Sequence, residues 1–187
     1  MGIEGLAGAL EREHREIDEG IAAFTAGLRS GNHDRQSVNR AVRALRRHIY
    51  LEEEFLFPLL CGANAGLAAP VFVMLREHGQ LWQTLDALER ELDASIDGAD
   101  SASELKLCRQ LAVQLLHHNL KEQKILYPVA DELLTASAAA RLRALFGSAE
   151  LPDSWVCAKA GSAPVLRPSA DRSAPARPQA PAPGSPS

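Results

Sequence analysis

Four long segments of the sequence carry apolar residues at alternating steps of three and four. This spacing places the apolar side chains on one face of an α-helix, and several such faces can share one core. The four predicted stripes are Ile3, Leu10, Ile17, Ile21, Phe24 and Leu28; Ala41, Leu45, Phe55 and Leu59; Val71, Leu75, Leu85 and Leu92; and Leu111, Leu115, Ile125 and Val129. Because the connections between them are short, we predict an all-α protein folded as an up-down-up-down antiparallel four-helix bundle.

The residues that flank the stripes predict where the helices begin and end. Glycine favours a helix end, proline is tolerated in a first turn, and a Ser-x-x-Glu pattern caps a helix start. The predicted boundaries are, in chain order, ends near Gly31 and Gly62, a start at about Pro70, an end at Gly98, a capping box of Ser101 and Glu104, and a short extra helix over 137–146 that closes at Gly147.

Composition divides the chain into a folded part and a tail. Its 187 residues, of which 46% are hydrophobic, suffice for one domain with a real core. Seven of the eleven prolines occur from residue 161 onward, mixed with alanine and serine. We predict one domain over residues 1–150 and a disordered Pro/Ala/Ser-rich tail over residues 151–187.

The charge pattern bears on partners and location. The net charge is -4, with no basic stripe of the kind that neutralises phosphates, so no nucleic acid partner is expected. No apolar run approaches the roughly 20 residues that span a bilayer, and the N-terminus lacks a signal-peptide pattern. We expect a cytoplasmic protein without a membrane partner. The three cysteines are far apart and are expected to be reduced. The sequence identifies no protein partner.

Each predicted stripe is interrupted where a core position holds a polar residue. The interruptions are His14 in the first helix, His48 with Glu52 in the second, His78 in the third, and His118 with Glu122 in the fourth. Four-residue spacing puts the imidazole and the carboxylate of each pair on one helix face. Burying unpaired carboxylates is costly, and a cation between them reverses their repulsion. We therefore predict that these six side chains hold metal.

The two halves of the chain repeat this pattern. Residues 48–58 and 118–128 both match H-x3-E-x3-L-[FY]-P, and in each half a lone histidine precedes the motif on the previous helix. An internal duplication of this kind predicts a site with approximate twofold symmetry, to which each half supplies two histidines and one glutamate.

Other polar residues near the motifs receive different interpretations. Glu53 and Glu54 are expected on a charged surface face. His117 points about 100° away from His118, and His33 lies in a predicted loop, so neither is a candidate ligand. Asp18 follows His14 by one turn and could orient a ligand or bind metal directly.

Two aromatic residues and two prolines within the motifs are assigned structural roles. Tyr50 and Tyr127 are interpreted as packing residues. Pro58 and Pro128 are expected to kink or end their helices just past the candidate ligands.

The donor set bears on the identity of the metal. Imidazoles and carboxylates without thiolates suit iron, manganese or zinc. Structural zinc normally has four ligands per ion, whereas three terminal or shared groups per metal plus exogenous bridges suit a di-iron centre better, so we favour iron. The Glu-x-x-His spacing of ferritin-like proteins occurs only once, at Glu11 and His14, which disfavours that reading. An interaction bundle without metal, in which the polar layer fixes helix pairing, remains an alternative.

With these motifs the sequence resembles the hemerythrin-like family, the HHE cation-binding domains, over about residues 8–134. The resemblance implies two irons with an oxo or hydroxo bridge. It implies bridging carboxylates at Glu52 and Glu122, one iron on His14 and His48, and the other on His78 and His118. Oxygen-carrying hemerythrins have a further histidine where this chain has Trp82. That difference leaves an open position and favours the bacterial branch linked to sensing and to repair of iron centres.

Two classes of function follow from the resemblance. The first is a protein that binds or senses oxygen, nitric oxide or peroxide, or handles iron. The alternative is an enzyme-like di-iron protein that removes nitric oxide or peroxide or repairs iron centres. We favour the first and assign no catalytic residue. The chain contains no Ser-His-Asp set, P-loop or dinucleotide fingerprint that would support other chemistry.

Overall fold

The computed structural model describes residues 5–94 and 101–161. Every regular element in these two ranges is a helix, which confirms the all-α prediction. The elements are α1 (Leu6–Arg29), α2 (Arg35–Leu51), the π-helix η1 (Glu52–Leu56), α3 (Phe57–Ala63), the 3-10 helix η2 (Ala65–Leu67), α4 (Ala68–Ala94), α5 (Ala102–Lys121), the π-helix η3 (Glu122–Leu126), α6 (Tyr127–Leu133) and α7 (Ala136–Ser148).

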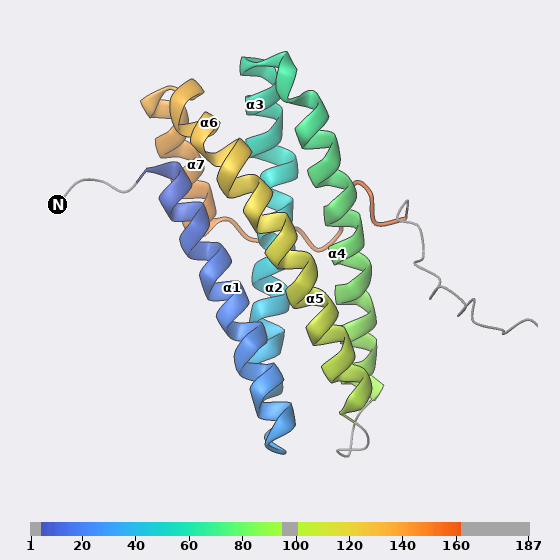
Figure 1. Ribbon diagram of the computed structural model, residues 1–187. Helices are drawn as coiled ribbons and strands as arrows, with labels where there is room; N and C mark the ends of the chain where they lie inside the picture. The colour runs from blue at the N-terminus through green and yellow to red at the C-terminus, as the bar shows by residue number, and fades with distance from the viewer. Residues whose placement is uncertain (1–4, 95–100, 162–187) are drawn as a thin grey trace, which may run out of the picture.

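The helices are arranged as four long rods that pack on one another. Figure 1 shows these rods side by side. They are α1, α2 continued by η1 and α3, α4, and α5 continued by η3 and α6. Helix α1 packs against α2 and α5, and α4 packs against α5 and α2, so the rods enclose a common interior. The shorter α7 packs against α1 and α2.

The interior consists of two apolar clusters separated by a polar layer. One cluster contains Ile17 and Leu45, and the other contains Leu10 and Leu51. Along α1, His14 lies between Leu10 of one cluster and Ile17 of the other. Each of the other three rods also contributes to both clusters, and its polar core residues lie at the point where it passes from one cluster to the other. The interruptions in the apolar stripes therefore meet in one layer across the bundle.

Two rods change from α to π geometry at this layer. The N–H of Phe57 bonds to the carbonyl of Glu52, and the N–H of Tyr127 bonds to that of Glu122, which is the i to i+5 pattern. A proline follows each segment, at the second residue of α3 and of α6. A proline ring clashes with the carbonyl four residues earlier in an α-helix, and the wider turn removes this clash. The prolines therefore start new helices directly after the polar layer.

The π segments correct the predicted core of these two rods. Phe55, Leu59, Ile125 and Val129 were expected inside, but Leu59 and Ile125 are 43% and 45% exposed. Each rod buries instead the residue that follows each expected one. These are Leu56, Leu60, Leu126 and Ala130. The cause is the wider π turn, which rotates the faces that follow it relative to a continuous α-helix.

Several predicted boundaries can be compared with the structure. The first helix ends at Arg29, and Gly31 has a φ of 78°, the left-handed backbone that glycine accepts readily. The capping box is wrong, because Ser101 makes no side-chain capping bond and Glu104 is buried. Helix α7 confirms the short extra helix. The expected helix end at Gly98 lies outside the described residues.

The described chain continues past the predicted domain end at residue 150. Residues 149–161 form turns and irregular structure that lie against the bundle. Trp155 packs on Tyr50 and Trp82, with ring centroids 5.2 and 5.4 Å apart. Cys157 is 3% exposed in one of the apolar clusters. The rest of the predicted tail, residues 162–187, lies outside the described residues.

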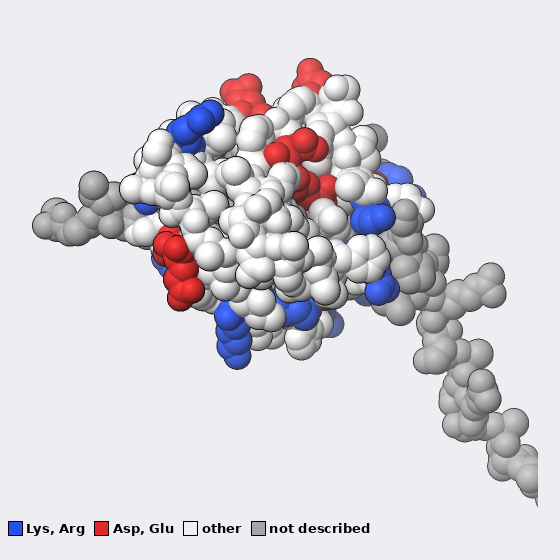
Figure 2. Space-filling view, turned by 90° about the horizontal axis from the view of Figure 1, so that it is seen from above, with Lys and Arg blue, Asp and Glu red and all other residues white. Residues whose placement is uncertain are grey.

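Among the described helices, none combines the length and the apolar character needed to cross a membrane. Seen from above in Figure 2, most of the visible face is uncharged, with one group of acidic side chains within its upper part and other acidic and basic side chains nearer its margin.

Candidate metal centre

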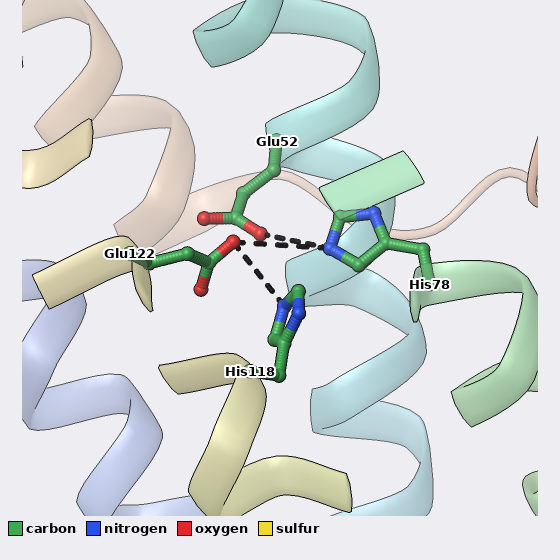
Figure 3. Close-up of side chains that lie close together, drawn as sticks. All are labelled: Glu52, His78, His118 and Glu122. Carbon is green, nitrogen blue, oxygen red and sulfur yellow. Dashed lines mark ion pairs between the residues drawn. The ribbon is translucent and has the colours of Figure 1, made fainter. Parts of the chain in front are cut away.

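All six candidate ligands lie in the polar layer between the apolar clusters, and each is at most 3% exposed. Their donor atoms form two groups that could each hold a metal ion. One group is Glu52, His78, His118 and Glu122, and the other is His14, His48 and Glu122. The side chains of the first group reach inward from three different rods (Figure 3).

In the first group, each histidine lies close to a different glutamate. Nε2 of His78 is 3.3 Å from Oε2 of Glu52, and Nε2 of His118 is 3.2 Å from Oε1 of Glu122. Nε2 of His78 also lies 3.9 Å from Oε1 of Glu122. Figure 3 shows these approaches as dashed lines. Four nitrogen and oxygen donors therefore face a common space.

The second group uses the other oxygen of Glu122, and the other oxygen of Glu52 also lies near its histidines. Nε2 of His14 is 2.9 Å from Nε2 of His48 and 3.3 Å from Oε2 of Glu122. Nε2 of His48 is 3.5 Å from Oε1 of Glu52. Each carboxylate thus turns one oxygen toward each histidine pair. That is the arrangement a carboxylate needs to bridge two ions.

The local sequence explains why each pair of motif residues converges. His48 lies in the last turn of α2, and Glu52 opens η1, so four-residue spacing carries both side chains to one face before the register changes. His118 and Glu122 repeat this arrangement at the end of α5 and the start of η3. π turns inside α-helices often occur at functional sites.

Three further glutamates orient three of the histidines. Nδ1 of His48 lies 2.7 Å from Oε2 of Glu13, and Nδ1 of His118 lies 3.2 Å from Oε2 of Glu77. An ionised carboxylate only accepts, so each Nδ1 is the donor. When the ring is neutral, its lone pair is therefore on Nε2, which faces the cluster. Sequence reasoning missed these residues, although a glutamate immediately precedes the lone histidine in both halves.

The third such glutamate is Glu53, which was expected on the surface. Its side chain is 3% exposed, and its Oε1 lies 2.9 Å from Nδ1 of His78. Its Oε2 accepts a 2.9 Å bond from the N–H of Ala158. The surface prediction is therefore wrong for Glu53, because Cys157 and Ala158, which lie after the predicted domain end, cover it. Glu54 is exposed, as expected.

Tyr127 was interpreted as a packing residue, but its hydroxyl lies inside the cluster. The side chain is fully buried, and its Oη lies 2.8 Å from Oε1 of Glu52 and 3.1 Å from Oε2 of Glu122. The same oxygen lies 3.0 Å from Nε2 of His14 and 3.4 Å from Nε2 of His48. No single-residue pattern marks this role, since the motif accepts phenylalanine at the same position.

Other residues considered in the sequence lie apart from the cluster. Asp18 accepts a 3.3 Å bond from Asn119 and belongs to neither donor group. His117 is exposed. The guanidinium carbon of Arg46 lies 4.2 Å from the centroid of the Trp82 ring, and Trp82 belongs to neither donor group.

The buried charges strongly perturb one another. Burial lowers the pKa of His118, but the charge and close approach of Glu122 and the hydrogen bond to Glu77 outweigh this effect and raise it to about 10. Burial raises the pKa of Glu122, and His118 and His14 outweigh that effect and hold it well below the ordinary value. Burial and both carboxylates raise the pKa of Tyr127. Such a layer of ionised carboxylates demands positive charge, which protons or metal ions can provide.

Unpartnered polar atoms show that the donor set fits a metal. Oε2 of Glu52, Nε2 of His78 and Oε1 of Glu122 are buried without a hydrogen bond among the described residues. All three belong to the first donor group. Buried polar atoms are normally satisfied, because leaving one unsatisfied costs about 1 to 3 kcal/mol. Imidazole and carboxylate donors of this kind suit a divalent transition metal.

Comparison with known proteins supports this reading of the geometry. The model of the hemerythrin HHE cation binding domain matches residues 6–130. No curated protein and no solved structure matches the chain. The matched region contains all six candidate ligands and covers most of the sequence. The chain therefore belongs to the family of hemerythrin HHE cation-binding domains.

Proposed function

We propose that this protein holds two iron ions in the polar layer and uses them to bind or sense a small ligand, namely oxygen, nitric oxide or peroxide. The observation that carries the proposal is the cluster of buried donor atoms on Glu52, His78 and Glu122 that make no hydrogen bond among the described residues. Iron held there would supply open coordination positions for such a ligand. The protein groups supply the donors, their orientation and a dry surrounding.

The ligand assignment forms part of the same proposal. One ion is assigned to His14 and His48 and the other to His78 and His118. Glu52 and Glu122 would be shared between the two ions, since each turns one oxygen toward each histidine pair. The up-down-up-down arrangement expected from the sequence also belongs here. It is supported by the short connections and by the side-by-side rods in Figure 1.

Burial limits the size of any ligand that reaches the ions. Glu52, His78 and Glu122 are 0% exposed, so an extended substrate has no path to them in this conformation. A surface pocket is lined in part by Glu13, Arg47 and Phe146. The Phe146 ring also packs edge-on against His48, with centroids 5.7 Å apart. The pocket therefore lies next to His48, at the edge of the polar layer.

Metal analysis of the purified full chain tests the proposal. The chain is loaded with ferrous iron under anaerobic conditions, freed of excess metal and analysed for iron per chain. We expect about two iron ions per wild-type chain, and fewer in a variant that lacks both Glu52 and Glu122. Stable folding with no bound iron under these conditions would contradict the proposal. Loading with zinc and manganese in parallel tests the choice of metal.

Ligand titration then separates sensing from turnover. Nitric oxide, oxygen and peroxide are added in turn to the iron-loaded chain while the visible spectrum is recorded. A spectral change that reverses when the ligand is removed supports binding or sensing. Consumption of nitric oxide or peroxide well above that by the same amount of free iron would instead support the enzyme-like alternative.

A further inference from the structure

The two halves of the cluster differ at one aromatic position. Tyr127 and Phe57 occupy the same place in the repeated motif, directly after η3 and η1. The Phe57 ring stacks on His78 with centroids 5.5 Å apart and an interplanar angle of 15°. The Tyr127 ring lies 5.5 Å from that of His14 at an angle of 33°. The approximate symmetry therefore pairs each aromatic ring with a lone histidine, and only one ring carries an oxygen.

The hydroxyl of Tyr127 is placed as a ligand atom would be. It lies between 2.8 and 3.4 Å from four donor atoms, on His14, His48, Glu52 and Glu122. Donor atoms at right angles around one ion, with bonds of about 2.1 Å, are about 3 Å apart. The distances between Tyr127 and its four neighbours match this separation.

Hydrogen bonding alone does not account for the placement. A phenol has one proton, and Glu52 and Glu122 both present an acceptor oxygen to it, at 2.8 and 3.1 Å. One of these two contacts must lack a proton. A cation in contact with the phenol oxygen and both carboxylates would satisfy all three oxygens together.

We propose that Tyr127 is a seventh protein ligand, which binds the ion held by His14 and His48 through its phenolate oxygen. When the metal binds, the O–H bond breaks, the proton leaves to solvent and the oxygen donates an electron pair to the metal. This inference rests on the proposed function. The donors on this side are then five, namely the two imidazoles, one oxygen from each of Glu52 and Glu122, and Tyr127.

The other side of the cluster lacks the fifth donor. His78 and His118 face one oxygen of each of the same glutamates, and Phe57 offers only carbon at the equivalent place. The ion there retains more positions for an exogenous ligand. Tyr127 thus makes the centre asymmetric and directs the small ligand to the ion held by His78 and His118.

The chain has two tyrosines, which allows a direct test. Tyr50 packs edge-on against Phe55 and Trp155, with centroids 5.7 and 5.2 Å apart, and the Tyr50→Phe variant leaves Tyr127 as the only phenol. This variant is loaded with ferrous iron and oxidised with air. We expect an intense visible band from phenolate-to-iron charge transfer. We also expect resonance-enhanced tyrosine ring modes that shift when ring-deuterated tyrosine is incorporated.

Two further variants complete the experiment. Tyr127→Phe should bind the same number of iron ions as wild type but lack the phenolate band and ring modes. Phe57→Tyr, which restores symmetry, should strengthen the band. Two bound irons without phenolate signals in the Tyr50→Phe variant would overturn the inference and leave the proposed function standing. Absence of bound iron in wild type would overturn both.

Discussion

Nδ1 of His78 lies 2.9 Å from Oε1 of Glu53, and the other oxygen of Glu53 accepts a hydrogen bond from the N–H of Ala158. One carboxylate therefore joins a candidate iron ligand on α4 to the segment that follows α7. The Cys157 thiol adds a 3.3 Å bond to the same carboxylate. The equivalent residue in the other half is Gln123, and Nδ1 of His14 is buried without a hydrogen bond to any residue that the structure describes. The approximate symmetry of the centre is thus broken at this position as well.

The first prediction concerns this contact. Glu53→Gln removes the charge that fixes the His78 ring and holds its proton on Nδ1. We expect metal affinity to fall by about 10- to 100-fold, because partners of this kind orient the ligand and raise its basicity. The measurement is iron retention in competition with a chelator. Iron bound to His78 and His118 should be lost first.

Glu54→Gln is the matched control for this change. Glu54 is the next residue, is exposed, and accepts its bond from the indole of Trp155 instead of from a histidine. Its substitution should leave chelator competition unchanged. Equal retention of iron by the two variants would show that Glu53 only packs against the covering segment.

The second prediction concerns the coupling of metal binding to folding. His118→Ala removes a candidate ligand and leaves Glu122 without its nearest imidazole, 3.2 Å away. We expect fewer iron ions per chain and a loss of about 3 to 5 kcal/mol in the free energy of unfolding, as when one partner of a buried ion pair is removed. Chemical denaturation with and without iron measures both effects, since a ligand that binds only the folded state stabilises it.

His117→Ala controls for the loss of a histidine at the same point of α5. His117 is exposed, and its removal should change the free energy of unfolding by no more than about 0.5 kcal/mol. Its iron content should equal that of wild type. If His118→Ala keeps full iron content and unfolds at wild-type denaturant concentration, the ligand assignment is wrong.

The sequence predicted the six clustered residues because their chemistry conflicts with their position. His48 and Glu52 interrupt an apolar stripe, and the same interruption recurs at His118 and Glu122. The helical period alone therefore predicted that each histidine and its glutamate point to the same side of their helix. The register beyond these residues could not be predicted in the same way. A π turn adds one residue to each hydrogen-bonded ring. The spacing of apolar residues before Pro58 is the same for a π turn as for an α-helix that ends at the proline, so the sequence does not reveal the π turn.

The surrounding residues were harder to predict because their partners lie on other elements. Glu53 resembles any charged residue on a helix face until Ala158, more than a hundred positions later, covers it. Tyr127 differs from Phe57 only in an oxygen, and whether that oxygen faces the cluster or solvent depends on packing. The repeated Glu-His dipeptides at 13–14 and 77–78 were the one available signal for Glu13 and Glu77.

The third prediction is a pH dependence that changes with metal loading. Without metal, His118 has a folded-state pKa raised to about 10 from 6.5. Its stabilising contribution is complete below pH 6.5 and is lost as the pH rises toward 10. The lowered pKa values of Glu52 and Glu122 contribute stability above their ordinary value of 4.5, and this is lost as the pH falls below it. The metal-free protein should therefore be most stable between about pH 4.5 and 6.5.

Bound metal should oppose the loss of stability that the metal-free protein shows as the pH rises above 6.5. Metal competes with protons for the imidazoles, so its affinity increases as the pH rises. Chemical denaturation of iron-loaded and iron-free protein, each followed from pH 6.5 to 10, measures the difference. We expect the gap in the free energy of unfolding to widen with pH. A gap that stays constant would show that the same histidines do not bind both protons and metal.

The last prediction concerns the close contact between α4 and the segment over residues 149–161. Gly79 follows His78, and a Cβ atom at this position would overlap the backbone of Lys159. Gly79→Ala should therefore push residues 157–160 away from α4, because the added methyl group and the backbone of Lys159 cannot occupy the same space. The side chain of Gln83, one turn along α4, donates a 2.8 Å bond to the carbonyl of Ala160, and this bond should weaken too.

Thiol labelling followed by mass spectrometry reads out this displacement at one residue. Cys157 is 3% exposed and burial raises its pKa to about 12, so it should react slowly in the wild-type chain. In Gly79→Ala it should react faster, while Cys108, which is fully buried in the bundle, stays protected and reports that the rods remain folded. The displaced segment also takes Ala158 from Glu53, which frees that carboxylate to turn away from His78. Iron retention should therefore decline in Gly79→Ala as the thiol of Cys157 becomes easier to label. Unchanged iron retention despite rapid labelling of Cys157 would show that Glu53 orients His78 without support from the covering segment.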